Sequence, residues 1–287
     1  MNWLGRFSVH IALVCFGLFC LIPPLLIISA SFTDEIALTR DGYRLLPSEF
    51  STHAYDLIFR NPNAILRAYA VSIIITTVGT LIAVTFMSLL AYVLSRPEFI
   101  LRKPLSFFVF FTMLFNGGIV PYYILMTQYL HVQDTIFALM LPYFVVAYYV
   151  LILRTYFAAL PAELIDAARV DGAGELRIFF SIALPLAKPA LATIGLFTAL
   201  NYWNDWTTAL YFIRDSDLYP LQYLLHIIQS NAQAMQLQSA AGNITVGALP
   251  TQTARMAMAV LATGPAALFF LFFQRYLVRG VTLGAFK

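Results

Sequence analysis

Four adjacent residues, Trp203-Asn204-Asp205-Trp206, combine two kinds of group that can hold a sugar. Aromatic faces can stack on its C–H surfaces, and a few placed polar groups can bond its hydroxyls. An ionisable side chain such as Asp205 in an apolar, membrane-spanning segment is costly and usually functional. The alternative is an aromatic belt at the membrane surface, where Trp gathers. Four helical residues spread over about 300°, so they cannot all face one path.

A second polar interruption, Asn116-Gly117-Gly118, lies in another apolar segment and is followed by Tyr122. A glycine pair in a membrane helix either permits close packing of helices or opens the backbone toward a cavity. Packing is the favoured interpretation. We nevertheless take Asn116 and Tyr122, together with residues 203–206, as candidate substrate-path residues.

A polar, small-residue segment of about twenty residues, 163–185, separates two long apolar blocks. Connections between helices are usually shorter, roughly 2–8 residues. Pro161 suits the first turn of a helix, and residues 162–170 favour helix formation. Gly172 and Gly174 then break that helix, and a second short helix is expected over residues 175–182. The whole reads as helix, glycine turn and helix.

This segment could be a surface made for another protein. Ala167 and Ala168 would leave a low-profile face that the groove of a partner could approach, and acidic Glu163 and Asp166 suit the first turns of the helix. The alternative interpretation, an ordinary amphipathic surface loop, stays open on these grounds alone.

No catalytic, metal-binding or nucleotide-binding constellation is visible. The four histidines are scattered, and no basic patch indicates nucleic-acid binding. The phosphate-binding pattern G-x-x-x-x-G-K-[ST] is absent, because none of the three lysines follows a glycine. We therefore expect no catalytic residue, no metal and no cofactor in this chain.

The composition indicates an integral membrane protein. Of 287 residues, 61% are hydrophobic and 11% are charged, against about 25% charged residues in soluble domains. A spanning helix needs about 20 mostly apolar residues. Six segments satisfy this requirement, and we expect one transmembrane domain over residues 1–287 with spans near 9–31, 65–94, 105–129, 135–159, 184–211 and 256–278.

The distribution of basic residues predicts the orientation. With the N-terminus in the cytoplasm, the inside segments hold 11 basic and five acidic residues, and the outside segments hold six basic and nine acidic residues. Both termini and the loop at 160–183 are therefore expected in the cytoplasm. The larger outside segments are 32–64 and 212–255, and a helix is expected within 218–240.

The polar loop resembles the EAA loop of ABC-importer permeases, whose pattern is EAA, three residues, G, nine residues and I-x-L-P. Here Asp166-Ala167-Ala168 precedes Gly172 and Ile182-x-Leu184-Pro185 at those spacings, with Asp166 replacing the first Glu. The resemblance implies that this loop is the coupling helix that docks in a cleft of an ATPase subunit. Residues implied in ATPase coupling are Asp166, Ala167, Ala168 and Gly172, with Arg169 and Asp171 adding polar contacts.

Further motifs are similar to carbohydrate-uptake permeases of the maltose-transporter class. They are residues 169–174, 184–192 and 278–284, and residues 116–123 and 203–206 look like its LplC/YtcP-type branch. That branch is associated with uptake of oligosaccharides and polysaccharide fragments, including uronate-containing ones.

The resemblance implies an all-α type I ABC importer permease with six transmembrane helices in a bacterial inner membrane. Its partners would be a second permease subunit, usually a different one, two ATP-binding cassette ATPase subunits that bind ATP and Mg, an extracytoplasmic solute-binding protein and an oligosaccharide. The alternatives are a secondary transporter or channel for a small polar solute and a membrane-embedded enzyme. An ion-coupled carrier should have several ionisable residues within its spans, and Asp205 is the one strong candidate.

Overall fold

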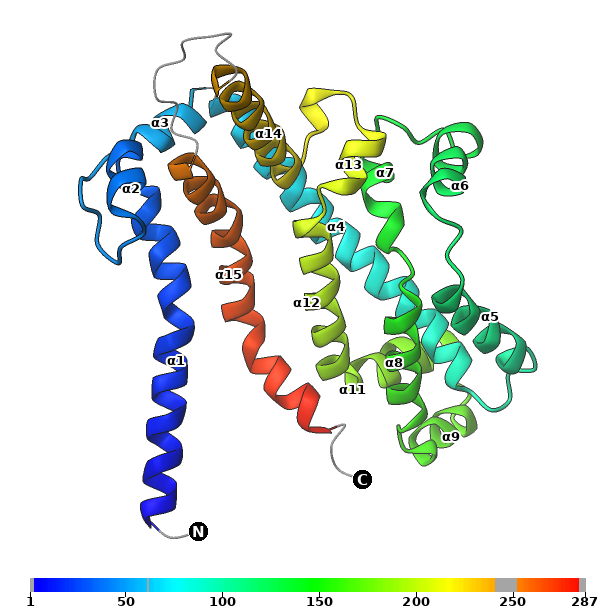
Figure 1. Ribbon diagram of the computed structural model, residues 1–287. Coiled ribbons are helices and arrows are strands. Elements are labelled where there is room, and N and C mark those ends of the chain that lie inside the picture. The colour runs from blue at the N-terminus through cyan, green and yellow to red at the C-terminus, as the bar shows by residue number, and fades with distance from the viewer. Residues whose placement is uncertain (1–2, 61, 241–251, 284–287) are drawn as a thin grey trace. The chain divides into compact units, whose positions relative to one another are not determined.

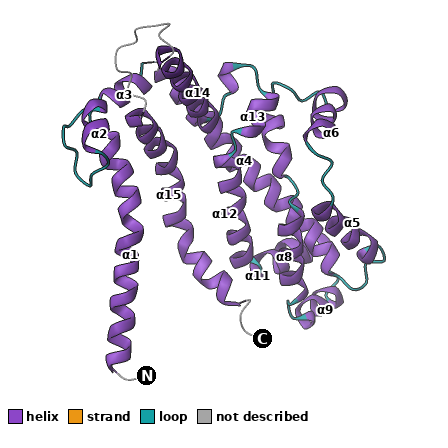
Figure 2. Ribbon diagram, in the orientation of Figure 1, coloured by secondary structure: helices purple, strands orange, loops and turns teal. Residues whose placement is uncertain are grey.

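Helices are the regular elements throughout the part of the chain that the computed structural model describes, residues 3–60, 62–240 and 252–283 (Figures 1 and 2). Within these ranges the one recorded strand-like pairing is an isolated antiparallel bridge between Thr33 and Phe50. The chain divides into two compact units. One comprises residues up to Leu66 and 224–265, and the other comprises residues 67–223 and 266 onward.

Two adjacent carboxylates after the N-terminal helix cap the starts of two helices in the first unit. Its elements are α1 (Trp3–Ser31), α2 (Glu35–Asp41), α3 (His53–Ile58), most of α14 (Leu221–Ala240) and the start of α15 (Gln252–Leu283). Asp34 accepts hydrogen bonds from the first N–H groups of α2. Glu35 accepts from the backbone N–H groups of Gln252 and Thr253 at 2.9 Å each, and so caps the start of α15.

The second unit is assembled from short and broken helices around α4. Its elements are α4 (Pro62–Ser95), α5 (Arg102–Leu114), α6 (Ile119–Ile124), a π-helical turn (Leu125–Tyr129), α7 (Ile136–Met140), a 3-10 turn (Leu141–Tyr143), α8 (Ala147–Ala158), α9 (Ala162–Val170), α10 (Glu175–Ile178), a second π-helical turn (Phe179–Ala183), α11 (Leu184–Leu186), α12 (Lys188–Asn204), α13 (Thr207–Phe212) and a 3-10 turn (Ser216–Leu218).

The helices of the described residues are long and apolar enough for three membrane spans, or for up to six if each bent pair counts as one span. Three are single helices, Val9–Ser31, Pro62–Ser95 and Gln252–Phe270. Three more are pairs of helices with a sharp bend between them. Residues 102–114 and 119–129 are bent by 114°, residues 136–143 and 147–158 by 52°, and residues 175–186 and 188–204 by 82°. Each predicted span falls largely on one of these, which agrees with the predicted all-α fold, while the crossing of a bilayer and the exact ends of each span stay predictions.

The fifth span differs from the expected continuous helix over residues 184–211. Its path bends before Lys188, and α12 ends at Asn204. Pro189 in the first turn of α12 suits a helix start at this bend. The polar residues at 203–206 mark the second break in the sequence, where they were interpreted as candidate substrate-path residues and not as a helix end.

A close crossing of α4 and α12 lies in the core of the second unit. A Cβ added at Gly79 would meet the ring of Tyr202 at 2.9 Å. That ring is fixed, because its hydroxyl donates to the carbonyl of Met140 at 2.7 Å and Tyr143 packs edge-on against it. Glycine is required at position 79 because there is no room for a side chain beside Tyr202. The contact joins residues far apart in the sequence, so neighbouring residues give no signal of it.

A turn ahead of α7 is tied to the chain after α13. Asp134 has a positive φ of 55°. Its N–H donates to the carbonyl of Phe212 at 3.0 Å, and its carboxylate accepts from the N–H groups of Arg214 and Asp215. Further along, the N–H of Leu221 donates to the Ser72 hydroxyl at 2.8 Å. These bonds attach the chain around α13 to α7 and to α4.

Gly79→Ala is expected to destabilise the protein by about 1–3 kcal/mol, because overpacking forces the Tyr202 ring or the backbone to shift. The measurement is thermal unfolding of the purified protein in detergent. Gly195→Ala is the matched control on the same helix pair, since its Cβ would meet Val84 at an ordinary 3.8 Å. The control should be neutral or stabilising, and equal losses in both variants would contradict the steric account.

Candidate functional site

The polar loop predicted from the sequence is a helix, a glycine turn and a second helix in the structure. α9 covers Ala162–Val170 as expected, and α10 begins at Glu175 and continues into the π-helical turn 179–183. The N–H of Gly172 donates to the carbonyl of Arg169 at 3.0 Å, and the N–H of Ala173 donates to that of Ala168 at 2.9 Å. This pair of bonds is the Schellman ending of a helix.

Gly172 is the residue that this ending requires to be glycine. Its φ is +79°, in the left-handed region, and a Cβ added there would meet nothing within 4 Å. The requirement is therefore one of backbone conformation and not of space. Gly174, with φ of −70° and the same open surroundings, carries no such requirement.

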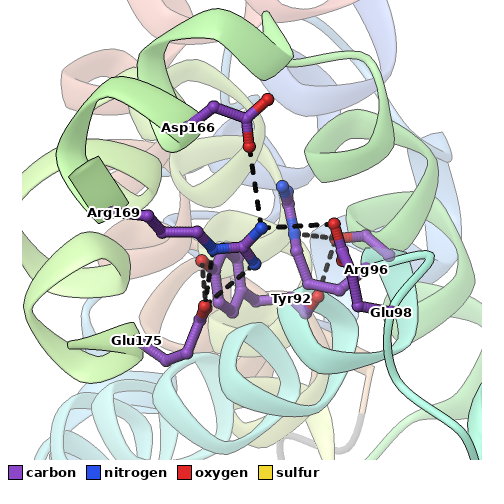
Figure 3. Close-up of polar contacts among 7 residues, drawn as sticks. Tyr92, Arg96, Glu98, Asp166, Arg169 and Glu175 are labelled. Carbon is purple, nitrogen blue, oxygen red and sulfur yellow. Dashed lines mark hydrogen bonds and ion pairs between the residues drawn. The ribbon is translucent and has the colours of Figure 1, made fainter. Parts of the chain in front are cut away.

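Arg169 lies at the centre of a polar cluster at the end of α9 (Figure 3). Its Nε and Nη2 both approach Glu175 Oε1 at 2.9 Å. Its Nη1 lies 3.2 Å from Glu98 and 3.6 Å from Asp166. Glu98 belongs to the turn between α4 and α5, so one guanidinium joins α9, α10 and the end of α4.

A second layer of contacts continues from this cluster toward α8. The Tyr92 hydroxyl of α4 donates to Glu175 Oε2 at 3.1 Å. The guanidinium of Arg96 lies 4.6 Å above the Tyr92 ring and donates to the carbonyl of Phe157 at 2.9 Å. Arg154 of α8 donates in turn to the carbonyl of Leu94 at 3.2 Å. The end of α4 is thus bonded to both α10 and α8.

The electrostatics of the cluster follow from these contacts. A hydrogen bond from its own backbone and then the bond from Arg169 hold the pKa of Glu98 below its usual range. Hydrogen bonds to Glu175 and Glu98 raise the pKa of Arg169 above its ordinary value. Both groups are accordingly charged at neutral pH, and the ion pairs are formed there.

The remaining predicted coupling residues line the outside of the loop. Ile165 turns inward and is buried, whereas Asp166, Ala167 and Asp171 are exposed and Ala168 is half-buried. Val170 is 88% exposed. The loop thus presents small and acidic side chains outward, while Arg169 is turned toward its own chain. Its predicted polar contact with an ATPase stays a prediction.

The Trp203–Trp206 segment forms the break between α12 and α13. Asp205 has extended backbone dihedrals, and its carboxylate accepts from the Thr207 hydroxyl at 2.8 Å and from the N–H and hydroxyl of Thr208. The acid therefore satisfies polar groups at the start of α13. This role was not visible in the sequence, where Asp205 was considered as a charged group within a span and as a polar group that could bond sugar hydroxyls.

Three of the four segment residues line one open pocket of about 280 Å³. Asn204, Asp205 and Trp206 contribute to it together with Tyr143, Asn201 and Thr207. Trp203 is instead 2% exposed and packs against Phe269, so its ring faces the interior of the chain. The structure therefore separates Trp203 from the other three, as the helical spread of adjacent residues requires.

Asn116 and Tyr122 line a second open pocket, of about 570 Å³, at the sharp bend between α5 and α6. The N–H of Gly118 donates to the Asn116 side chain at 2.9 Å, and Gly118 adopts a φ of +82°. A Cβ at Gly117 or Gly118 would meet nothing closer than 3.9 Å among the described residues. Among the described residues no other helix packs closely against this glycine pair, and both glycines line the pocket, so the structure favours the alternative that they open the backbone onto a cavity.

Within the described residues no group of three or more His, Cys, Asp or Glu side chains could hold a metal ion. Sequence reasoning missed the residues that position the loop, namely Tyr92, Arg96, Glu98 and Glu175. A weak signal existed, since Glu98 is the one acid in the turn between α4 and α5 and could have been paired with Arg169 by charge. The pocket residues Tyr143 and Thr207 carried no such signal.

Comparisons with known proteins agree on one family. The family model described as binding-protein-dependent transport system inner membrane component matches residues 54–283. The chain is 38% identical to the polygalacturonan/rhamnogalacturonan transport system permease protein YtcP of Bacillus subtilis over 100% of the chain and 99% of that protein. It is 36% identical to protein LplC of the same organism, over 94% and 90%.

A solved structure is similar over almost the whole chain. It is a crystal structure of a bacterial ABC transporter involved in the import of the acidic polysaccharide alginate, with a TM-score of 0.79 and 29% identity. The match covers 96% of this chain and 98% of the chain in that structure.

Gly172→Ala is expected to weaken the end of α9, because the left-handed region costs an L residue about 1–2 kcal/mol. Amide hydrogen exchange at residues 172 and 173 should become about 5- to 30-fold faster. Gly174→Ala is the control, with the same added methyl group in an ordinary conformation, and should leave exchange unchanged or slower. Equal acceleration in both variants would show that the added methyl group, and not the handedness of the turn, is responsible.

Proposed function

Because the chain belongs to the family of binding-protein-dependent transport system inner membrane components and is a permease subunit of an ABC importer, we propose that it moves an oligosaccharide or a polysaccharide fragment across the cytoplasmic membrane. Movement is by alternating access, in which a central path opens first to one side and then to the other. The solutes in the names of YtcP and of the alginate transporter support a polysaccharide-derived substrate.

The exposed loop formed by α9, the Gly172 turn and α10 supports the proposal that another protein supplies the energy for transport. The loop presents Ala167 and the acidic Asp166 and Asp171 outward, beside a helix end closed by the Schellman turn. A low, rigid face of this kind suits docking in the cleft of another protein. The occupant that we propose is an ATP-binding cassette ATPase subunit, which also binds the ATP and Mg.

The pocket at the end of α12 supports contact with sugar hydroxyls. Its polar lining groups are amides, a phenol, a hydroxyl and one carboxylate, beside the indole of Trp206. Such groups can bond hydroxyls while an aromatic face packs on the ring. No Lys or Arg is among the residues that line it, so the carboxylate of an acidic sugar would be held by basic groups of the partners.

The finer assembly is part of the same proposal. Two permease subunits, two ATPase subunits and an external solute-binding protein form the importer, and the second permease is a different chain. The charge asymmetry of the connections favours both termini in the cytoplasm. Segments 32–64 and 212–255 then face the binding protein, and the loop at 160–183 faces the ATPase.

The test is co-purification of this chain with the permease, ATPase and binding protein encoded beside it, followed by ATPase assays with sugar-loaded binding protein. A panel of neutral and uronate-containing oligosaccharides identifies the substrate. We expect a stable complex whose ATPase is stimulated by one sugar class. Transport by the chain alone in vesicles on an ion gradient, with no bound ATPase, would replace this proposal by a secondary carrier.

Trp206→Ala is expected to impair sugar passage by removing an aromatic face from the pocket. An aromatic contact contributes about 0.5–1.5 kcal/mol. The KM for sugar uptake, measured with sugar-loaded binding protein, should therefore rise about two- to tenfold. Trp206→Phe, which keeps an aromatic face, should retain most of the activity. Unchanged uptake kinetics in Trp206→Ala and in Asn204→Ala would assign these side chains to the membrane surface and not to the path.

A further inference from the structure

We propose that Arg169 is a positioning residue that fastens the α9–α10 loop to the end of α4, so that these segments move as one body when the loop is displaced. The inference rests on the proposed function, because it concerns how movement of the loop reaches the membrane helices. It also assigns Arg169 to contacts within its own chain and not to a contact with an ATPase.

The guanidinium is occupied by its own chain. Nε and Nη2 lie 2.9 Å from Glu175, and Nη1 lies 3.2 Å from Glu98 and 3.6 Å from Asp166. Only 31% of the Arg169 side chain is exposed, against 67% for Asp166. Figure 3 shows the guanidinium between these carboxylates. A partner that recruited Arg169 would have to break this cluster.

The three carboxylates come from three different segments. Asp166 is one turn earlier on α9, Glu175 begins α10, and Glu98 belongs to the turn after α4. Glu175 is shared, since its second oxygen accepts from Tyr92 within α4. The loop is therefore attached to α4 at two points, directly through Glu98 and through Glu175 to Tyr92.

The attachment continues beyond α4. Arg96 packs on the Tyr92 ring and donates to Phe157 near the end of α8. A continuous path of ion pairs, hydrogen bonds and one cation–π contact thus runs from α9 through α4 to α8.

The contribution of this cluster to folding should be small, which separates its role from ordinary stabilisation. Exposed ion pairs contribute little to stability, because solvent screens them and the side chains lose conformational freedom. Loss of Arg169 should therefore leave a folded chain in which the loop is less firmly attached. The deficit belongs to coupling and not to folding.

The direct test measures one distance. Spin labels at Ile100 and Val170, which are 93% and 88% exposed, report on the α4–α5 turn and on α9. Both labels are introduced through cysteine in the full complex after Cys15→Ser and Cys20→Ser, since these two native cysteines are free and exposed. One narrow distance distribution, unchanged between nucleotide-free and ATP-bound states, is expected. Arg169→Gln should broaden it.

Arg177→Gln is the matched control. Arg177 is an exposed base in α10, and no ion pair of its side chain is recorded among the described residues. The control should keep the narrow distribution. A distribution that stays narrow in Arg169→Gln, or that changes between nucleotide states in the wild-type complex, would overturn the one-body movement.

The functional test separates coupling from docking. In Arg169→Gln the ATPase should still co-purify, while the maximal ATPase stimulation by sugar-loaded binding protein falls about fivefold or more and its KM changes little. Arg169→Lys should recover part of the stimulation. Glu98→Gln should add little to the loss in Arg169→Gln, because the two residues act through one contact.

Three outcomes are decisive. Full stimulation in Arg169→Gln contradicts the positioning role. Loss of the ATPase from Arg169→Gln alone, with Arg177→Gln intact, makes Arg169 a docking residue and also contradicts it. A wild-type complex that binds no ATPase and is not stimulated by any sugar overturns the proposed function itself, independently of what Arg169 does.

Discussion

The main constraint on this molecule comes from the backbone N–H groups at the starts and breaks of its helices. These groups have no partner within their own helix. A bilayer offers no water to satisfy them, so each group needs a partner from the protein. Short polar side chains supply those partners here. Asn116 accepts from Gly118 and Asp205 accepts from Thr208, each at a break within a predicted span. The apolar helices can be broken where they are because these acceptors stand beside the breaks.

The breaks are also where the two pockets lie. The bend at Gly118 opens one cavity, and the end of α12 at Asp205 opens the other. Both positions combine irregular backbone with polar side chains, as expected where membrane protein backbone lines a cavity and not lipid. The same residues thus satisfy the backbone and give each pocket part of its polar surface.

One continuous stretch of chain connects the polar loop to the second pocket. After α9 and the Gly172 turn it runs through α10, the π-helical turn and α11, bends by 82°, and continues along α12 to Asp205. α12 has 17 residues, about 25 Å of helix at 1.5 Å per residue. If the start of α12 rotated, the helix itself would carry that movement to the pocket, and no other segment would be needed.

Local structure could be predicted from the sequence, and distant contacts could not. The helix over 162–170 and its end at Gly172 follow from Pro161 and the glycines, which act on their immediate neighbours. The end of α12 at Asn204 was missed, because the polar residues 203–206 were interpreted as part of a substrate path and not as a helix end. Gly79 against Tyr202 and Glu35 against Thr253 join residues more than a hundred positions apart, and one sequence holds no signal for such pairs.

The turn at Gly172 selects for chirality and not for size. The space around its missing Cβ is open, yet an L side chain would be strained there, whereas a D side chain would be at ease. Ribosomal synthesis offers no D residue, so the one achiral amino acid fills the position. As a result the corner of the loop has no side chain, and whatever docks there meets bare peptide groups.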